Sequence, residues 1–231
     1  MTFPACFCWT RFGTEAGQAI DQIFERKEQE RAANGGVFFW GIGNAIGPSI
    51  RELLRRTAIP EVLFSPIRSV PRIADAKPSA VVAWTAAETL EGEPFQLPGH
   101  SLVTSRYDPN APKESSYALV CFSPRPLNES RCDEQIAFAG LRNLRTGRPV
   151  GASQVTAIVK NTSVSVAETP RYEVLIRAKL VEPYFLRLRG PLLLSKSDQD
   201  LDWGRTVHGV WQRRLSEVSP QSATKSQRLF S

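Results

Sequence analysis

Gly36–Arg56 reads Gly-Val-Phe-Phe-Trp-Gly-Ile-Gly-Asn-Ala-Ile-Gly-Pro-Ser-Ile-Arg-Glu-Leu-Leu-Arg-Arg, and it changes from a strand-like to a helix-like pattern. Its first part is apolar and rich in β-branched and aromatic residues, which predicts a buried strand. Ser49 and Glu52 have the spacing of a capping box, which predicts a helix that starts near Ile50. Three glycines separate the two segments: Gly41, Gly43 and Gly47. Such glycines leave a backbone that a ligand can approach closely, so this stretch is the first candidate site.

The charge balance allows an anionic partner. The chain has 231 residues, with 29 Lys and Arg, 23 Asp and Glu, and a formal net charge of +6. Its pI of about 9.4 lies above the value of about 9 that is typical of nucleic-acid-binding domains. An ordinary protein with a positively charged surface explains the same numbers. A hydrophobic content of 42% is enough for a buried core, which excludes disorder throughout the chain.

The sequence predicts a cytoplasmic protein without a membrane segment. No apolar run approaches the roughly 20 residues that span a bilayer. Residues 1–11 lack the basic and long apolar regions of a signal peptide, so we expect reduced cysteines. Cys6 and Cys8 share one face of a strand and could suit a soft metal, but Cys121 and Cys132 lack the spacing of a second zinc half-site. We therefore expect neither a metal nor a cofactor.

Strands follow strands through most of the chain, which predicts the α+β class. We expect a curved mixed β-sheet or a small β-barrel with helices packed on it. Residues 1–215 are predicted to form a single domain, in which 124–150 is an irregular excursion. Three basic residues lie on that excursion and are expected to be flexible: Arg142, Arg145 and Arg148. Residues 216–231 are poor in apolar side chains and are expected to be disordered.

The individual elements follow from hydrophobic periodicity. Strands are predicted over residues 5–12, 37–44, 61–65, 80–87, 100–107, 117–122, 155–160, 171–180 and 183–188. Helices are predicted from Thr14, from Ile50, near 134–138 and over 205–215. The strands 100–107 and 117–122 are expected to pair. The charged run Glu25–Arg31 in the first helix is expected to project into water, held by pairs such as Arg26 with Glu30.

Tryptophans on predicted strands, combined with arginines near strand ends, indicate a pocket for a nucleobase. In such a pocket an unstacked base lies on an aromatic face and arginines hold the phosphates. The predicted base-binding residues are Trp9, Trp40, Gly41, Gly43, Asn44, Ser65 and Trp84. The predicted phosphate-binding residues are Arg11, Arg51, Arg55, Arg68 and Arg106. Core packing is the alternative explanation for tryptophans on strands.

Part of the chain resembles the PUA-like superfamily, which includes the EVE, YTH and ASCH domains. The similar parts are Cys8-Trp9-Thr10, the helix after it, and the strand Val37–Asn44, within the first two thirds of the chain. In these small β-barrels a helix follows the first strand, and an aromatic cleft holds a base that is often modified. The resemblance implies a module that recognises a flipped or modified base in DNA or RNA. Other protein subunits stay open as partners.

Two other function classes stay open. An enzyme acting on a nucleotide or nucleic acid is one, because Gly41-x-Gly43-x-x-x-Gly47 precedes a predicted helix and Asp75-Ala-Lys77 matches a fragment of Mg²⁺ nucleases. The glycine spacing departs from G-x-G-x-x-G, however, and the chain lacks βαβ alternation. A protein–protein adaptor is the other. Binding of nucleic acid without catalysis is the favoured hypothesis.

Overall fold

The computed structural model describes residues 3–13, 19–43, 45–67, 80–98, 102–105, 116–151, 154–162 and 171–193. These residues form an 11-stranded mixed sheet with two α-helices, which places the chain in the α+β class. The helices are α1 (Ile20–Ala33), α2 (Gly47–Arg56) and the 3₁₀ helix η2 (Phe138–Gly140). The strands are β1 (Cys6–Phe12), β2 (Val37–Ile42), β3 (Glu61–Pro66), β4 (Ala80–Glu88), β5 (Pro94–Phe95), β6 (Leu102–Ser105), β7 (Ser116–Phe122), β8 (Arg131–Ala137), β9 (Leu141–Asn143), β10 (Thr156–Asn161) and β11 (Arg171–Leu193).

The sheet is organised around β11. Its main path runs β2-β7-β11-β3-β1-β10-β9, while β4 and β8 also pair with β11, and β5 and β6 pair with β4. All of these pairs are antiparallel except β1 with β3. The path ends at β2 and at β9, so the described strands do not close into the small β-barrel that was one of the two predicted forms.

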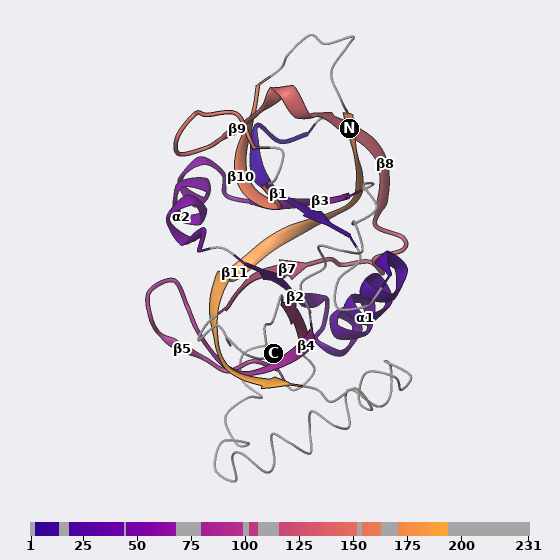
Figure 1. Cartoon of the computed structure of the whole chain (residues 1–231), viewed down its shortest axis with the longest axis vertical. Coiled ribbons are helices and arrows are strands. Elements are labelled where there is room, and N and C mark those ends of the chain that lie inside the picture. The colour runs from indigo at the N-terminus through magenta and orange to yellow at the C-terminus, as the bar shows by residue number, and fades with distance from the viewer. Residues whose placement is uncertain are drawn as a thin grey trace, which may run out of the picture.

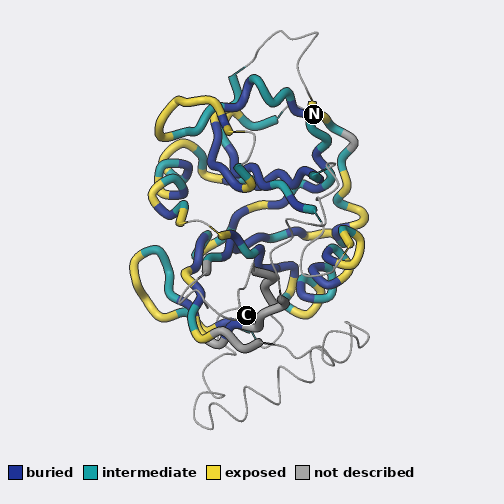
Figure 2. Tube along the Cα trace, viewed as in Figure 1, coloured by how far each residue is buried: buried dark blue, intermediate teal, exposed yellow. Residues whose placement is uncertain are grey.

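Figure 1 shows that β11 passes through both halves of the molecule. We call the half with β1, β3, β8, β9 and β10 the upper half, and the half with β2, β4, β5, β6 and β7 the lower half. In both halves the strands curl around buried apolar side chains, and Figure 2 colours long stretches of these strands as buried. Helix α1 lies against β2, and α2 lies on the opposite side of the molecule.

Alternation along the strands divides the buried side chains into three cores. The upper core contains Phe7, Trp9, Leu63, Ile136, Leu141, Val150, Ala157, Val159 and Val174. The lower core contains Val37, Phe39, Trp84, Ala87, Leu97, Ala118, Val120, Leu186 and Leu188. The central core lies between the halves and includes Cys8, Phe12, Phe38, Trp40, Phe64, Leu119 and Ile176. Strands β1, β2, β3, β7 and β10 thus send alternate side chains to different cores, because successive side chains point to opposite faces.

Strand β11 was predicted as two strands and is one. Burial alternates over its first part, where Val174, Ile176 and Ala178 are buried and Lys179 is exposed. A cis peptide at Glu182-Pro183 and a positive φ at Tyr184 interrupt the pattern, and the register against β7 shifts there. The strand continues beyond this irregularity, because its two parts pair with the same neighbour.

Helix α2 begins at Gly47, three residues before the predicted start. Its N-cap is Ile46, whose carbonyl accepts hydrogen bonds from the backbone N–H groups of Ser49 and Ile50. The predicted capping box is wrong, because Glu52 instead pairs with Arg55 and Arg56. Gly47 is buried, and a Cβ there would lie 2.7 Å from Leu90 Cδ2, so a larger residue at this position would displace the Leu90 side chain.

The remaining differences from the sequence predictions concern pairing and type. The strands predicted near 100–107 and 117–122 exist as β6 and β7, but β6 pairs with β4, whereas β7 pairs with β2 and β11. The predicted helix near 134–138 is wrong, because those residues belong to β8 and η2. The predicted excursion 124–150 therefore contributes two strands to the sheet. The helix predicted over 205–215 and the tail 216–231 lie outside the described residues.

None of the helices in the described part of the chain is long and apolar enough to cross a membrane.

Candidate nucleic-acid interface

The structure does not bring the three predicted tryptophans together. Trp9 belongs to the upper core, Trp40 to the central core and Trp84 to the lower core. Their exposed fractions are 0%, 8% and 2%. Each indole is thus covered by its own core, and a single pocket lined by all three is not present among the described residues.

Trp40 packs against other aromatic rings of the central core. Its ring centroid lies 4.7 Å from that of Phe64 and 5.7 Å from that of Phe12, both with edge-to-face geometry. Gly41 follows it in β2 opposite Ala118. Gly43 is exposed just after the strand, and a Cβ there would meet nothing within 4 Å. Asn44 lies outside the described residues.

Trp9 and Ser65, both predicted to bind a base, bind each other. The parallel pairing of β1 with β3 sets Trp9 opposite Leu63 and Arg11 opposite Ser65. The Trp9 indole Nε1–H donates a hydrogen bond of 2.9 Å to Ser65 Oγ, and both residues are fully buried. A buried indole N–H needs such a partner, so this contact gives Ser65 a structural role.

Four side chains at one end of the upper core combine aromatic faces with a guanidinium. We call Trp9, Arg11, Phe138 and Tyr172 the Arg11 cluster. The Arg11 guanidinium carbon lies 5.7 Å from the Trp9 ring centroid and 5.4 Å from that of Tyr172. Phe138 lies 5.8 Å from Trp9 and 5.3 Å from Tyr172, centroid to centroid. The guanidinium is thus positioned over aromatic faces at cation–π distances.

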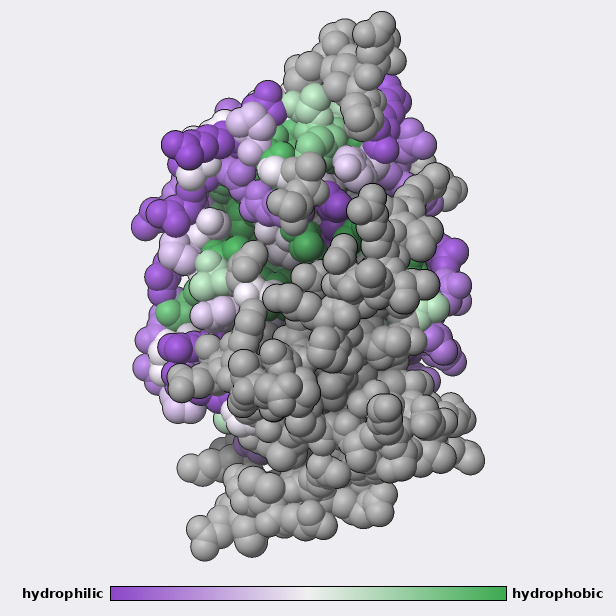
Figure 3. Space-filling model, in the orientation of Figure 1, coloured by the Kyte–Doolittle hydropathy of each residue, from purple (hydrophilic) through white to green (hydrophobic). Residues whose placement is uncertain are grey.

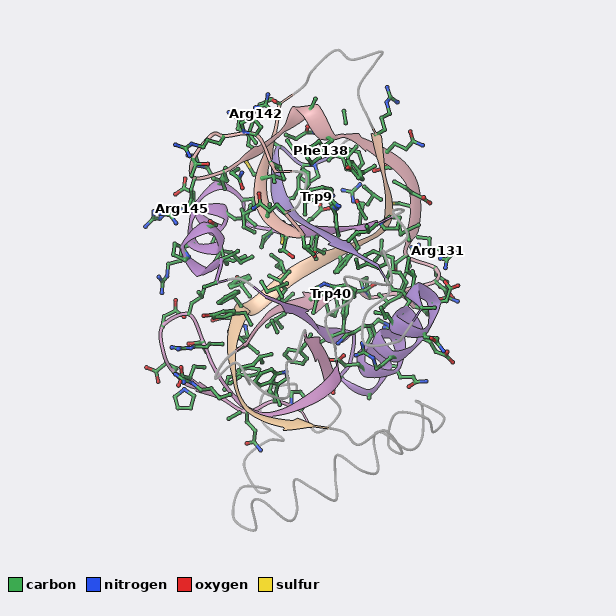
Figure 4. The ribbon with its side chains drawn as sticks, viewed as in Figure 1. Trp9, Trp40, Arg131, Phe138, Arg142 and Arg145 are labelled. Carbon is green, nitrogen blue, oxygen red and sulfur yellow. The ribbon has the colours of Figure 1, made fainter. Side chains whose placement is uncertain are left out.

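The Arg11 cluster is partly open to solvent. Arg11, Phe138 and Tyr172 are half-buried, whereas Trp9 beneath them is fully buried. Figure 4 shows Trp9 and Phe138 inside the ring of strands of the upper half, while Trp40 lies between the halves. Figure 3 shows hydrophobic residues on the visible face of the upper half, with hydrophilic residues on both sides of them. Half-buried aromatic rings and a planar guanidinium can stack with a nucleobase.

Sequence reasoning missed two members of this cluster. Phe138 falls at the end of the helix predicted near 134–138, whereas in the structure it follows the strand β8 and starts the short 3₁₀ helix η2. Tyr172 lies within the predicted strand 171–180, but sequence alone did not show that its ring meets Trp9. Alternation in residues 5–12 and 171–178 identifies the faces, whereas the pairing of distant strands decides which faces meet.

The predicted phosphate-binding arginines are not in one place. Arg11 points into the upper half, whereas Arg51 and Arg55 lie on the exposed side of α2. Arg51 donates a hydrogen bond of 2.6 Å to the Leu90 carbonyl, and Arg55 pairs with Glu52 at 3.4 Å. Arg68 and Arg106 lie outside the described residues, as do Asp75 and Lys77 of the nuclease hypothesis.

Three residues of the charged run of α1 are buried rather than solvated, which corrects the prediction for Arg26, Lys27 and Glu30, whereas Glu25 is exposed as predicted. Arg26, Lys27 and Glu30 are each no more than 3% exposed. Lys27 Nζ donates to Glu30 Oε2 at 2.6 Å and to the Phe39 carbonyl, and the Phe39 N–H donates to Glu30 Oε1 at 3.0 Å. Because β2 is the last strand on its side of the main path, these side chains satisfy backbone groups that a neighbouring strand would otherwise bond.

Burial sets the ionisation of this interior. It lowers the pKa of Lys27 from 10.5 to about 8, although the nearby Glu30 carboxylate acts in the opposite direction. Burial also raises the pKa of Glu30 above 4.5, against the effect of Lys27. The thiols of Cys8 and Cys121 are buried in the adjacent central core, and desolvation raises the pKa of both. Neither thiol is therefore activated as a nucleophile or a metal ligand.

Among the described residues, no group of three or more His, Cys, Asp or Glu side chains is arranged to hold a metal ion. Comparison of the chain with protein-family models, curated proteins and solved structures found no match.

Proposed function

We propose that this chain binds nucleic acid and receives an unpaired, flipped or modified base at the Arg11 cluster. The observation that carries the proposal is the position of the Arg11 guanidinium over the Trp9 and Tyr172 rings, next to the half-buried ring of Phe138. Stacking on such faces tolerates any base, and polar groups around the rim can select one. The proposal assigns base stacking to Phe138 and Tyr172, whereas the sequence prediction assigned it to Trp40 and Trp84.

Net charge is the second support. A formal charge of +6 favours a polyanionic partner, and phosphate contacts supply most of the affinity of such complexes. The resemblance of Cys8–Thr10 and Val37–Asn44 to PUA-like domains belongs to this proposal and agrees with base recognition. A cytoplasmic location is also part of the proposal, since nucleic acid is present there and the four cysteines stay reduced. The proposal assigns no catalytic step to the chain.

Phe138→Ala is the direct test, with single-stranded DNA and RNA oligonucleotides carrying unmodified or methylated bases as probes. Loss of a stacking face worth about 1–3 kcal/mol lowers affinity by about 5- to 150-fold. Fluorescence anisotropy measures the dissociation constants, and circular dichroism establishes that the variant is folded. Tyr172→Ala is expected to have an effect of the same size.

Phe95→Ala is the matched control, because Phe95 is also a half-buried phenylalanine but packs on Phe39 in the lower half. Its affinity for the same oligonucleotides should equal that of the wild type. Folded Phe138→Ala and Tyr172→Ala variants that bind as tightly as the wild type would remove the base site from the Arg11 cluster. Absence of any binding by the wild type at low salt would contradict the function itself.

A further inference from the structure

We propose, building on the function above, that α2 and the hairpin that begins with β9 form a phosphate-binding track for the single strand that carries the recognised base. The hairpin covers residues 141–150 and follows η2 directly, so it begins three residues after Phe138 of the Arg11 cluster. The track is thus connected through the chain to the proposed base site.

The hairpin is basic and has no acidic residue to neutralise it. No Asp or Glu occurs between Glu134 and Glu168, whereas four basic residues do: Arg142, Arg145, Arg148 and Lys160. Arg145 and Arg148 are exposed, and neither has an ion pair with another described residue. An anion that binds here therefore replaces no carboxylate.

The hairpin is held in shape by hydrogen bonds, although the sequence suggested a flexible segment. The Asn143 N–H donates to the Arg148 carbonyl at 2.8 Å, and the Gly147 N–H donates to the Asn143 carbonyl at 2.8 Å. Gly147 takes a φ of 65°, in the left-handed region that favours glycine. The Arg142 side chain is already bonded at the base of the hairpin, where it donates to the carbonyls of Ala139 and Leu141. Arg145 and Arg148 are thus presented on a fixed backbone, which lowers the entropic cost of binding.

Helix α2 adds basic residues next to the hairpin. Leu144 of the hairpin and Leu54 of α2 both pack on the rim of the central core, and Figure 4 shows Arg145 on the same side of the molecule as α2. Arg55 and Arg56 are exposed and share one carboxylate, that of Glu52. The helix therefore keeps an excess of positive charge towards solvent, alongside Arg145 and Arg148.

A single strand fits this arrangement, because a base can enter the Arg11 cluster only when it is unpaired. Its backbone can then follow the hairpin from Phe138 towards Arg145, Arg148 and α2. Four arginine–phosphate contacts predict a slope of about −3 for the logarithm of the binding constant against the logarithm of salt concentration, from about 0.7 per contact.

Arg145→Ala/Arg148→Ala tests the track with single-stranded oligonucleotides of about 12 nucleotides, within the site sizes known for single-strand binders. Loss of two contacts reduces the magnitude of the slope by about 1.4 when the dissociation constant is measured from about 50 to 200 mM KCl. The loss of affinity should be equal for all base sequences, because phosphates carry no sequence information. Arg125→Ala/Lys179→Ala is the matched control, since both residues are exposed and lie outside α2 and the hairpin. The two substitutions remove the same amount of positive charge.

The outcomes separate this inference from the proposed function. An unchanged salt slope in Arg145→Ala/Arg148→Ala would overturn the track, and Phe138→Ala would still report independently on the base site. A reduced slope together with an unaffected Phe138→Ala variant would support the track and contradict the base site. An equal loss of slope in the control variant would overturn the track in favour of a diffuse positive surface. Tighter binding to a 12-base-pair duplex, with the same dependence on Arg145 and Arg148, would overturn the choice of a single strand.

Discussion

At the scale of single residues, the Lys27–Glu30 pair replaces a neighbouring strand for β2. The carboxylate accepts from the Phe39 N–H and the ammonium donates to the Phe39 carbonyl, so one residue of an edge strand is bonded by side chains of α1. A buried ion pair of this kind contributes little net stability, but removal of one partner is costly because the other charge stays buried.

Lys27→Met is therefore expected to lower the free energy of unfolding by about 3–5 kcal/mol, because it leaves Glu30 buried without its nearest cation. Urea denaturation followed by circular dichroism measures the change. Lys27→Met/Glu30→Gln should recover part of the loss, since a neutral amide oxygen can still accept from the Phe39 N–H. A single variant as stable as the wild type would contradict the burial of this pair.

The depressed pKa of Lys27 predicts a pH dependence. The unfolded chain has a lysine pKa near 10.5 and the folded chain one of about 8, so between these values the unfolded state binds more protons at this residue. The contribution of Lys27 to stability therefore rises as pH rises from about 8 to 10.5. Over this range the unfolding free energy of the wild type should therefore rise relative to that of Lys27→Met/Glu30→Gln. A difference independent of pH would show that Lys27 titrates normally.

Sequence could not reveal the burial of Arg26, Lys27 and Glu30. Charged residues at spacings of three and four look the same on a solvated helix and on one that covers a strand edge. Only the position of Phe39 at the end of the sheet path distinguishes the two cases. Burial of Trp9 and Trp40 was predictable from alternation, whereas their separation into different cores depends on which strands pair.

At the scale of elements, the turn from α1 to β2 follows from its two consecutive glycines. The Gly36 N–H donates to the Arg31 carbonyl, and both Gly35 and Gly36 have positive φ angles of 63° and 101°. Local chemistry decides such a turn, so the sequence contains enough information. The assignment of β8 as a strand could not be predicted in the same way, because residues 131–137 form a strand only through their pairing with β11.

Gly36→Ala tests this turn. The new Cβ would lie 2.6 Å from Phe122 Cε2 and 3.1 Å from the Ser123 carbonyl oxygen, in a backbone conformation that disfavours side chains. We expect a loss of about 2–4 kcal/mol of stability from strain and overlap together, measured by thermal and urea unfolding. Gly35→Asn is the control, because nothing lies within 4 Å of its Cβ position and asparagine tolerates a left-handed φ. Equal stability of the two variants would contradict the close contact at Gly36.

At the scale of the whole molecule, the two halves share β11 and the central core. The strand is hydrogen-bonded to β3 and β8 in the upper half and to β4 and β7 in the lower half. Composition and strand count predicted the α+β class and a curved mixed sheet. The order of the strands could not be predicted, because pairs such as β1 with β10 join residues about 150 positions apart through contacts that local patterns do not encode.

One cooperative unfolding transition is therefore expected for both halves. Variants that keep only Trp9 or only Trp84, with the other tryptophans replaced by phenylalanine, report on the upper and the lower core separately. Their urea midpoints by fluorescence should each coincide with the midpoint by circular dichroism for the same variant. A fluorescence midpoint that differs from the circular dichroism midpoint in either variant would mean that the halves unfold independently.

The late position of β11 in the chain also affects how the protein is made. During synthesis β3 emerges about 100 residues before β11, which corresponds to roughly 5–20 s at ordinary translation rates. Throughout that interval β3 lacks its β11 partner, and β7 lacks it over the last half of the interval, so their apolar faces and free edges are open to other chains. We therefore expect the nascent chain to need protection by chaperones at the ribosome until residues 171–193 have emerged and joined the two halves.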